Sequence, residues 1–117
     1  MERLVSATRN SLRALHVLMR DEAAFKSEVV ALSLALPVGW FVAPTLGGYL
    51  LLIGVILALM IVEALNTAIE AACDAFSREF NADIRLAKDC GSLAVALTMI
   101  IAAAVWAVAL WERFIVG

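Results

Sequence analysis

Residues 46–74 read LGGYLLLIGVILALMIVEALNTAIEAACD, and this stretch decides the fold. Its first part, residues 46–62, contains no charged side chain and is almost wholly apolar, which is typical of a helix that crosses a membrane. Four polar residues follow at helical spacing and form one stripe: Glu63, Asn66, Glu70 and Asp74. A carboxylate inside a bilayer costs roughly 2.5–3.5 kcal/mol on insertion scales. The stripe must therefore face protein, water, a cation or a substrate, and it is the first place to look for function.

The composition of the whole chain agrees with a membrane protein. The 117 residues are 64% hydrophobic, whereas a soluble domain is nearer half apolar. We expect one small integral membrane domain. The net charge of -2 and the absence of a basic face or known module give no sign of nucleic-acid binding. Cys73 and Cys90 lie too far apart, with too few other ligands, for a zinc site, and we expect free thiols.

Turn residues divide the apolar sequence into spans. Residues 29–62 are uncharged, which is far longer than the roughly 20 residues that one membrane-spanning helix needs. Pro44, Gly47 and Gly48 interrupt this segment and predict a turn. Because the first span is short, we expect its helix to continue back through the acidic residues before it. The predicted elements are a surface helix over 1–27, transmembrane helices over 28–44, 48–73 and 89–113, and a cytoplasmic loop over 74–88.

The N-terminal segment has the pattern of an amphipathic helix. Apolar residues recur there at helical spacing, and arginines lie between them: Arg3, Arg9, Arg13 and Arg20. These arginines either bind lipid head groups or phosphate, or only anchor the helix at the membrane surface.

The basic residues predict the orientation in the membrane. Lys and Arg are concentrated in the N-terminal segment and in the loop over 74–88, and the turn after the first span has none. The positive-inside rule therefore places the N-terminus and this loop in the cytoplasm and the C-terminus on the other side. Trp40, Trp106 and Trp111 lie near the predicted span ends, as in an aromatic belt.

Carboxylates outnumber basic side chains near the predicted cytoplasmic ends of the spans. Glu22, Glu28 and Asp89 join the polar stripe there, together with Lys88. Such a surplus favours a divalent cation, and Mg²⁺ usually takes one or two carboxylates with substrate phosphate. A lysine suits a phosphoryl group, and a carboxylate at the membrane edge can act as a general base. The alternative is an ion-pair network that only joins helices, and spacing alone does not separate phosphoryl transfer from ion transport.

The residues that form this pattern resemble a known family. The stripe EALNTAIEAACD, followed by Ala-Lys-Asp at 87–89 and Gly-Ser at 91–92, is similar to the prokaryotic diacylglycerol kinase family, as is the upstream segment at 22–28. The resemblance covers almost the whole chain. It implies an all-α homotrimeric bundle in the bacterial inner membrane, with a cytoplasmic N-terminus, a periplasmic C-terminus and active sites at subunit boundaries.

The resemblance also implies a reaction and its residues. The γ-phosphate of ATP would pass to the hydroxyl of diacylglycerol, giving phosphatidate for phospholipid recycling. Glu63 would be the general base, Glu22 and Glu70 would hold Mg²⁺, and Asn66 and Asp74 would support the site. The residues implied to bind ATP are Arg3, Asn10, Glu22, Glu70, Glu79, Asn81, Lys88 and Asp89. The residues implied to contact the lipid substrate are Arg3, Ser11, Ala24, Glu28, Glu63, Ser92 and Trp106.

Some positions depart from the family pattern or bear on the substrate. Asn10 stands where many relatives have an aromatic residue, and Asn81 where a histidine is common. Cys-Gly-Ser at 90–92 resembles the diacylglycerol branch of the family, and an undecaprenol kinase is the alternative. An ion or proton carrier and a structural membrane subunit are less favoured alternatives.

Overall fold

The computed structural model describes residues 1–117 and contains helices but no strand. Three helical segments are long and apolar enough to cross a membrane. The prediction of an all-helical chain with three such helices is therefore confirmed. The elements are α1 (Glu2–Asp21), α2 (Ala23–Val42), α3 (Leu46–Phe76), α4 (Ala82–Trp111) and a short π-helix, η1 (Glu112–Val116).

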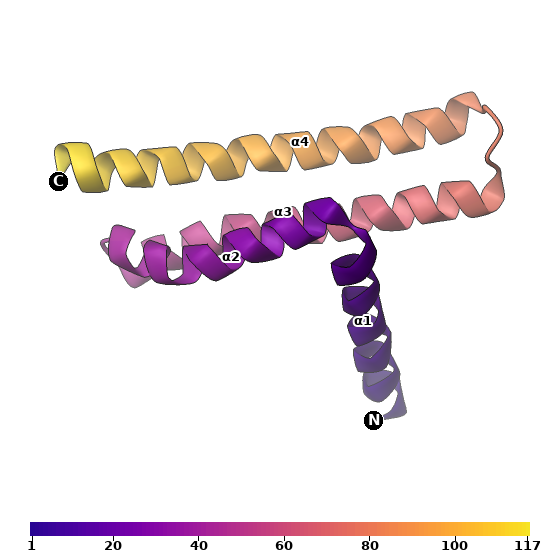
Figure 1. The fold of residues 1–117 in the computed structure, drawn as a ribbon, viewed down its shortest axis with the longest axis horizontal. Coiled ribbons are helices and arrows are strands. Elements are labelled where there is room, and N and C mark those ends of the chain that lie inside the picture. The colour runs from indigo at the N-terminus through magenta and orange to yellow at the C-terminus, as the bar shows by residue number, and fades with distance from the viewer.

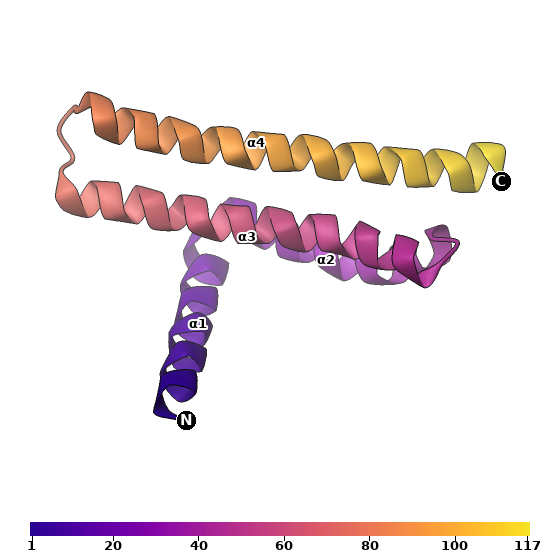
Figure 2. The same cartoon turned by 180° about the vertical axis from the view of Figure 1, so that it is seen from behind.

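The three long helices form a bundle from which α1 departs. In Figure 1, α3 and α4 lie side by side as a hairpin, and α2 runs along α3, whereas α1 turns steeply away. The turn between α2 and α3 and the C-terminal end of α4 lie at the same end of the bundle. The view from behind in Figure 2 shows the N-terminus well away from the long helices.

The first helix ends earlier than the sequence indicated. Glu22 has an extended backbone (φ -106°, ψ 106°), so α1 stops at Asp21 and α2 begins at Ala23, whereas the predicted boundary lay between 27 and 28. Residues 23–27 therefore belong to α2, in agreement with the expectation that the first span continues back through the acidic residues before it.

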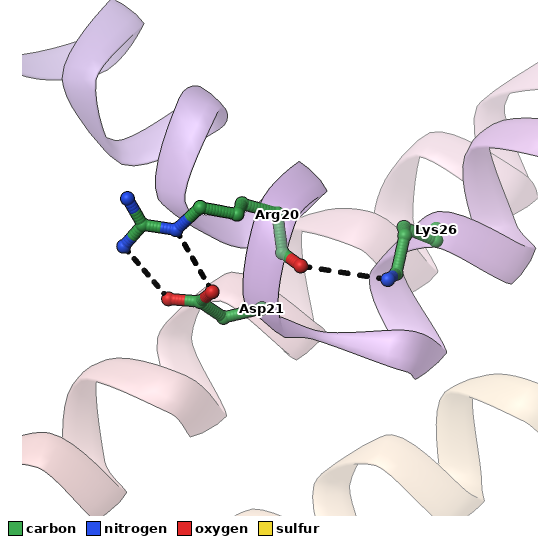
Figure 3. Close-up of polar contacts among 3 residues, drawn as sticks. All are labelled: Arg20, Asp21 and Lys26. Atoms are coloured by element: carbon green, nitrogen blue, oxygen red, sulfur yellow. Dashed lines mark hydrogen bonds and ion pairs between the residues drawn. The ribbon is translucent and has the colours of Figure 1, made fainter.

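Polar contacts of Arg20, Asp21 and Lys26 border this break (Figure 3). The Arg20 guanidinium donates two hydrogen bonds of 2.9 Å to the Asp21 carboxylate, which lowers the pKa of Asp21. The Lys26 ammonium donates a long bond of 3.5 Å to the Arg20 carbonyl. A side chain of α2 thereby reaches one of the last carbonyls of α1, which its own helix leaves without a partner.

Side-chain caps fix the starts of α3 and α4. The Thr45 hydroxyl accepts a hydrogen bond of 3.0 Å from the Gly48 N–H. The Asn81 Oδ1 accepts from the N–H groups of Asp83 and Ile84, at 2.8 and 3.2 Å. Each oxygen satisfies donors that a helix N-terminus leaves free. The connection between α3 and α4 consequently spans only 77–81, whereas the sequence predicted a loop over 74–88.

The apolar core lies toward the end of the bundle that holds the α2–α3 turn. Ala35, Ile53, Val55 and Ile56 form a buried cluster, against which Trp106 of α4 packs. The core also contains two hydrogen bonds between helices. The Trp106 indole donates to the Leu52 carbonyl at 3.1 Å, and the Tyr49 hydroxyl to the Leu36 carbonyl at 2.9 Å. These bonds satisfy polar groups that a bilayer would leave without partners.

Candidate functional site: a buried carboxylate cluster

The polar stripe of α3 faces protein in its first half. Glu63 is 7% exposed and Asn66 is 8% exposed, in spite of their polarity. Helix α2 presents a third buried polar side chain, Glu28, which is 8% exposed and close enough for its charge to interact with that of Glu63. Two buried carboxylates from different helices thus lie near one another. Burying them together is costly unless a proton, a cation or a substrate accompanies them.

Two further carboxylates border this pair. Glu22 lies at the break before α2 and Glu70 one turn beyond Asn66, and both are half-buried. The charges of both act on Glu63. We call Glu22, Glu28, Glu63 and Glu70 the carboxylate cluster. None of its members takes part in any of the three ion pairs of the chain.

Asn66 links the cluster to α4. Its Nδ2 donates a hydrogen bond of 3.1 Å to Glu70 Oε1. Its Oδ1 is directed at Gly91 of α4, where an added Cβ would overlap this oxygen. Gly91 is the only buried residue of α4. Its missing side chain therefore provides the space in which the Asn66 amide lies.

Two oxygens in this region are buried without any hydrogen-bond partner, Glu28 Oε1 and Asn66 Oδ1. Buried hydrogen-bond acceptors nearly always have a partner in folded proteins, so each of these two unpartnered oxygens requires an explanation. A ligand hydroxyl, an ordered water or a carboxyl proton would satisfy the Glu28 oxygen.

Lys88 provides a positive charge near the cluster. Its Nζ lies 2.8 Å from Asp74 Oδ1, in an ion pair that joins α4 to the last turns of α3. The charge of Lys88 also interacts with that of Glu70. Both partners of the ion pair are more than a third exposed, so the pair positions the ammonium more than it stabilises the fold.

The residues near the α3–α4 connection are exposed and make mostly local contacts. The Asn81 Oδ1 accepts the two capping hydrogen bonds at the start of α4. This cap was not predicted from the sequence, although an Asn just before a helical segment is a typical N-cap signal. The Glu79 N–H bonds the Ser77 hydroxyl at 3.1 Å. Asp89 lies 4.0 Å from Arg85 on the surface of α4. Ser92 and Ala24 are exposed.

The single chain does not bring every predicted site residue to the cluster. Arg3, Asn10 and Ser11 are exposed on α1, and the Ser11 hydroxyl bonds only the Ala7 carbonyl of its own helix, at 2.9 Å. Trp106 bonds Leu52, which precedes Glu63 by eleven positions. At a rise of about 1.5 Å per residue, that is about 16 Å along α3.

The donor set of the cluster suits Mg²⁺. No three acidic, His or Cys side chains are arranged to enclose a metal within the chain. Mg²⁺, however, commonly uses one or two carboxylates and completes its octahedron with water and substrate phosphate. Glu22 and Glu70 are half-buried and have no cation as partner, so they can serve in this way. Cys73 and Cys90 are free thiols.

Known proteins match nearly the whole chain. The sequence model for prokaryotic diacylglycerol kinase matches residues 9–110. The diacylglycerol kinase of Escherichia coli (strain K12) is 37% identical over 112 residues, which are 96% of this chain and 92% of that protein. The diacylglycerol kinase of Pseudomonas aeruginosa is 40% identical over 102 residues, covering 86% and 83% of the two chains. That of Haemophilus influenzae is 31% identical over 103 residues, covering 88% and 87%.

Proposed function

Because the chain belongs to the prokaryotic diacylglycerol kinase family, we propose that it transfers the γ-phosphate of ATP to the hydroxyl of diacylglycerol in the bacterial inner membrane. The product is phosphatidate, which returns to phospholipid synthesis. The observation that supports this most directly is the carboxylate cluster, buried where two membrane-crossing helices meet and without a cation of its own. The relatives are all named diacylglycerol kinases, which favours this acceptor over undecaprenol.

Glu63 is the general base of the proposed reaction. The lipid hydroxyl oxygen attacks the γ-phosphorus, the bond to the β–γ bridging oxygen breaks, and ADP leaves. The hydroxyl proton passes to the Glu63 carboxylate. Burial keeps bulk water away from this carboxylate, so that the lipid hydroxyl is the acceptor and hydrolysis of ATP is limited. Glu28 is close enough to Glu63 for their charges to interact, and its unpartnered oxygen can accept a hydrogen bond from the lipid glycerol.

The other residues of the site position phosphate. Glu22 and Glu70 hold Mg²⁺, which when bound neutralises phosphate charge. Asn66 orients the Glu70 carboxylate through its 3.1 Å hydrogen bond. Asp74 holds Lys88, which contacts the phosphates. Phosphoryl transfer depends mostly on such positioning and charge neutralisation. The remaining proposed ATP contacts are Arg3, Asn10, Glu79, Asn81 and Asp89, and the remaining proposed lipid contacts are Ser11, Ala24, Ser92 and Trp106.

We place α1 on the cytoplasmic membrane surface as an amphipathic helix, with the C-terminus in the periplasm. Within one chain, Arg3 and Ser11 lie on a helix that departs from the bundle, and α4 is exposed along most of its length. A homotrimer with sites at its subunit boundaries accounts for both features, because a neighbouring subunit can cover part of α4 and supply the missing contacts.

The test is ATP consumption by the purified protein in lipid–detergent micelles with Mg²⁺. We expect turnover that requires a lipid alcohol and is faster with diacylglycerol than with undecaprenol. The Glu63→Gln variant should lose about 10²- to 10⁴-fold in kcat, the usual value of a general base. Glu2→Gln, which removes an exposed carboxylate from α1, is the matched control. Full turnover by Glu63→Gln would exclude the general-base role, and absence of turnover with every lipid alcohol would exclude the kinase.

A further inference from the structure

The end of the bundle opposite the α3–α4 connection contains an open cavity of about 800 Å³, within the range of small-molecule sites. It lies between the α2–α3 turn and the last turns of α4, the end where Figures 1 and 2 show the C-terminus. We call it the terminal groove. Its wall is mostly hydrophobic, with Leu51 and Leu52 of α3 facing the small residues Ala104 and Ala109 of α4. None of the residues of the carboxylate cluster contributes to it.

An arginine is fixed beside the groove. Arg113 lines it, and its Nε donates a 3.3 Å hydrogen bond to the Phe41 carbonyl. Its guanidinium also lies 4.5 Å from the centre of the Phe41 ring and 5.6 Å from that of Phe114. These contacts hold the side chain but leave its other donors unused. No carboxylate lies within 4.0 Å of it.

A carboxylate of opposite charge lies next to this arginine. Glu112 also lines the groove and is exposed, and it forms no ion pair with Arg113. One end of an apolar groove thus carries a separate anion and cation. Aromatic side chains lie close to these elements in sequence: Trp111 precedes Glu112, and the edge-to-face pair of Trp40 and Tyr49 flanks the α2–α3 turn. Such residues are enriched where a membrane meets water.

We propose that the terminal groove binds one membrane phospholipid whose zwitterionic head group carries a primary ammonium. An acyl chain lies against Leu51, Leu52, Ala104 and Ala109, the phosphate accepts hydrogen bonds from Arg113, and the ammonium pairs with Glu112. The apolar groove matches the acyl chain, and the two separate charges match the two charges of the head group. The site does not depend on the proposed phosphoryl transfer.

Native mass spectrometry of the purified protein with equimolar phosphatidylethanolamine and phosphatidylglycerol tests the proposal. We expect one phosphatidylethanolamine per chain to be retained in preference to phosphatidylglycerol. Arg113→Gln should weaken retention of both lipids by about tenfold or more, the size of a charge-assisted contact. Glu112→Gln should remove the preference for phosphatidylethanolamine. Arg78→Gln, which removes an arginine near the opposite end of the bundle, should change neither result.

A variant that fills the groove provides an independent test. Ala109→Phe should lower lipid retention while the kinase activity, measured with saturating lipid, shows that the chain has folded. Equal retention of the two lipids, or retention that Arg113→Gln and Ala109→Phe leave unchanged, would overturn the proposal. So would a change in oligomeric state on Ala109→Phe without loss of lipid, because a second copy of the chain would then occupy the groove.

Discussion

At the scale of single residues, Gly91 and Asn66 are the pair on which the geometry of the site depends most. The Asn66 amide lies in the space left by the missing Gly91 side chain and donates to Glu70. Any side chain at position 91 must displace the amide or separate α3 from α4. The orientation of the Glu70 carboxylate therefore depends on a residue of another helix.

We predict that Gly91→Ala lowers kcat by about tenfold or more, because displacement of the Glu70 carboxylate, which we propose to hold Mg²⁺, would weaken the positioning of phosphate. The matched control is Gly54→Ala, since a Cβ at Gly54 meets nothing within 4 Å. That control should keep full activity and gain up to about 1 kcal/mol of helix stability. The measurements are kinase activity and thermal unfolding. Equal activity of the two variants would contradict the role given to Gly91.

The residues of the stripe could be identified from sequence, but their partners could not. The spacing of Glu63, Asn66 and Glu70 on one helical face follows from 3.6 residues per turn. The contact with Gly91 depends on how α3 and α4 cross, and one helix's periodicity contains no information on that. The nearness of Glu28 to Glu63 likewise depends on the packing of α2 against α3.

At the scale of the helices, the sequence predicted the membrane-crossing elements better than their ends. Long uncharged, apolar segments usually form membrane-spanning helices, which is why all three of these helices were predicted. The observed helix ends differ from the predicted ones because charged residues are compatible with a helix that extends beyond the hydrocarbon. Helix α4 begins at Ala82 since Asn81 caps it there, although the uncharged run starts only at Cys90.

The cap at Asn81 gives a prediction that separates a structural role from ATP binding. Asn81→Ala removes the oxygen that accepts from Asp83 and Ile84, and should cost about 1 kcal/mol of stability. Asn81→Ser keeps an accepting oxygen without adding a charge, and should keep most of the stability. Thr45→Ala removes the other cap and serves as the control for a pure stability effect.

The measurements are thermal unfolding and the KM for ATP. A raised KM in Asn81→Ser with unchanged stability would show that the amide itself contacts the nucleotide. An unchanged KM in Asn81→Ser would limit Asn81 to the cap. Unchanged stability of Asn81→Ala would contradict the cap.

At the scale of the whole molecule, the single chain leaves Arg3 and Ser11, two of the proposed substrate contacts, away from the carboxylate cluster. Helix α1 projects from the bundle, and α4 buries only Gly91. Composition and periodicity do not report oligomeric state, so the homotrimer rests on the family resemblance and on these exposed surfaces.

We predict that variants with defects on different helices complement one another in mixed oligomers. Arg3→Gln and Glu63→Gln should each have low activity alone. Mixing the two under conditions that exchange subunits should restore part of the activity, because an intact Arg3 from one chain then meets an intact Glu63 from another. Two samples of Glu63→Gln, mixed in the same way, are the control. Failure to restore activity, with exchange verified by labelled subunits, would place Arg3 and Glu63 of each site in the same chain.

The uncharged turn between α2 and α3 has a consequence for how the protein is made. The turn is formed by residues 43–45, and Thr45 caps its own helix there. During synthesis, α2 and α3 can enter the bilayer together as a preassembled pair, since no ionised group has to be carried through the hydrocarbon with them. In the orientation that we propose, the α3–α4 connection, which carries Arg78 and Glu79, stays on the ribosome side. In the same orientation Glu112 and Arg113 must cross the hydrocarbon with their charges, and these two groups make the insertion of α4 the costly step.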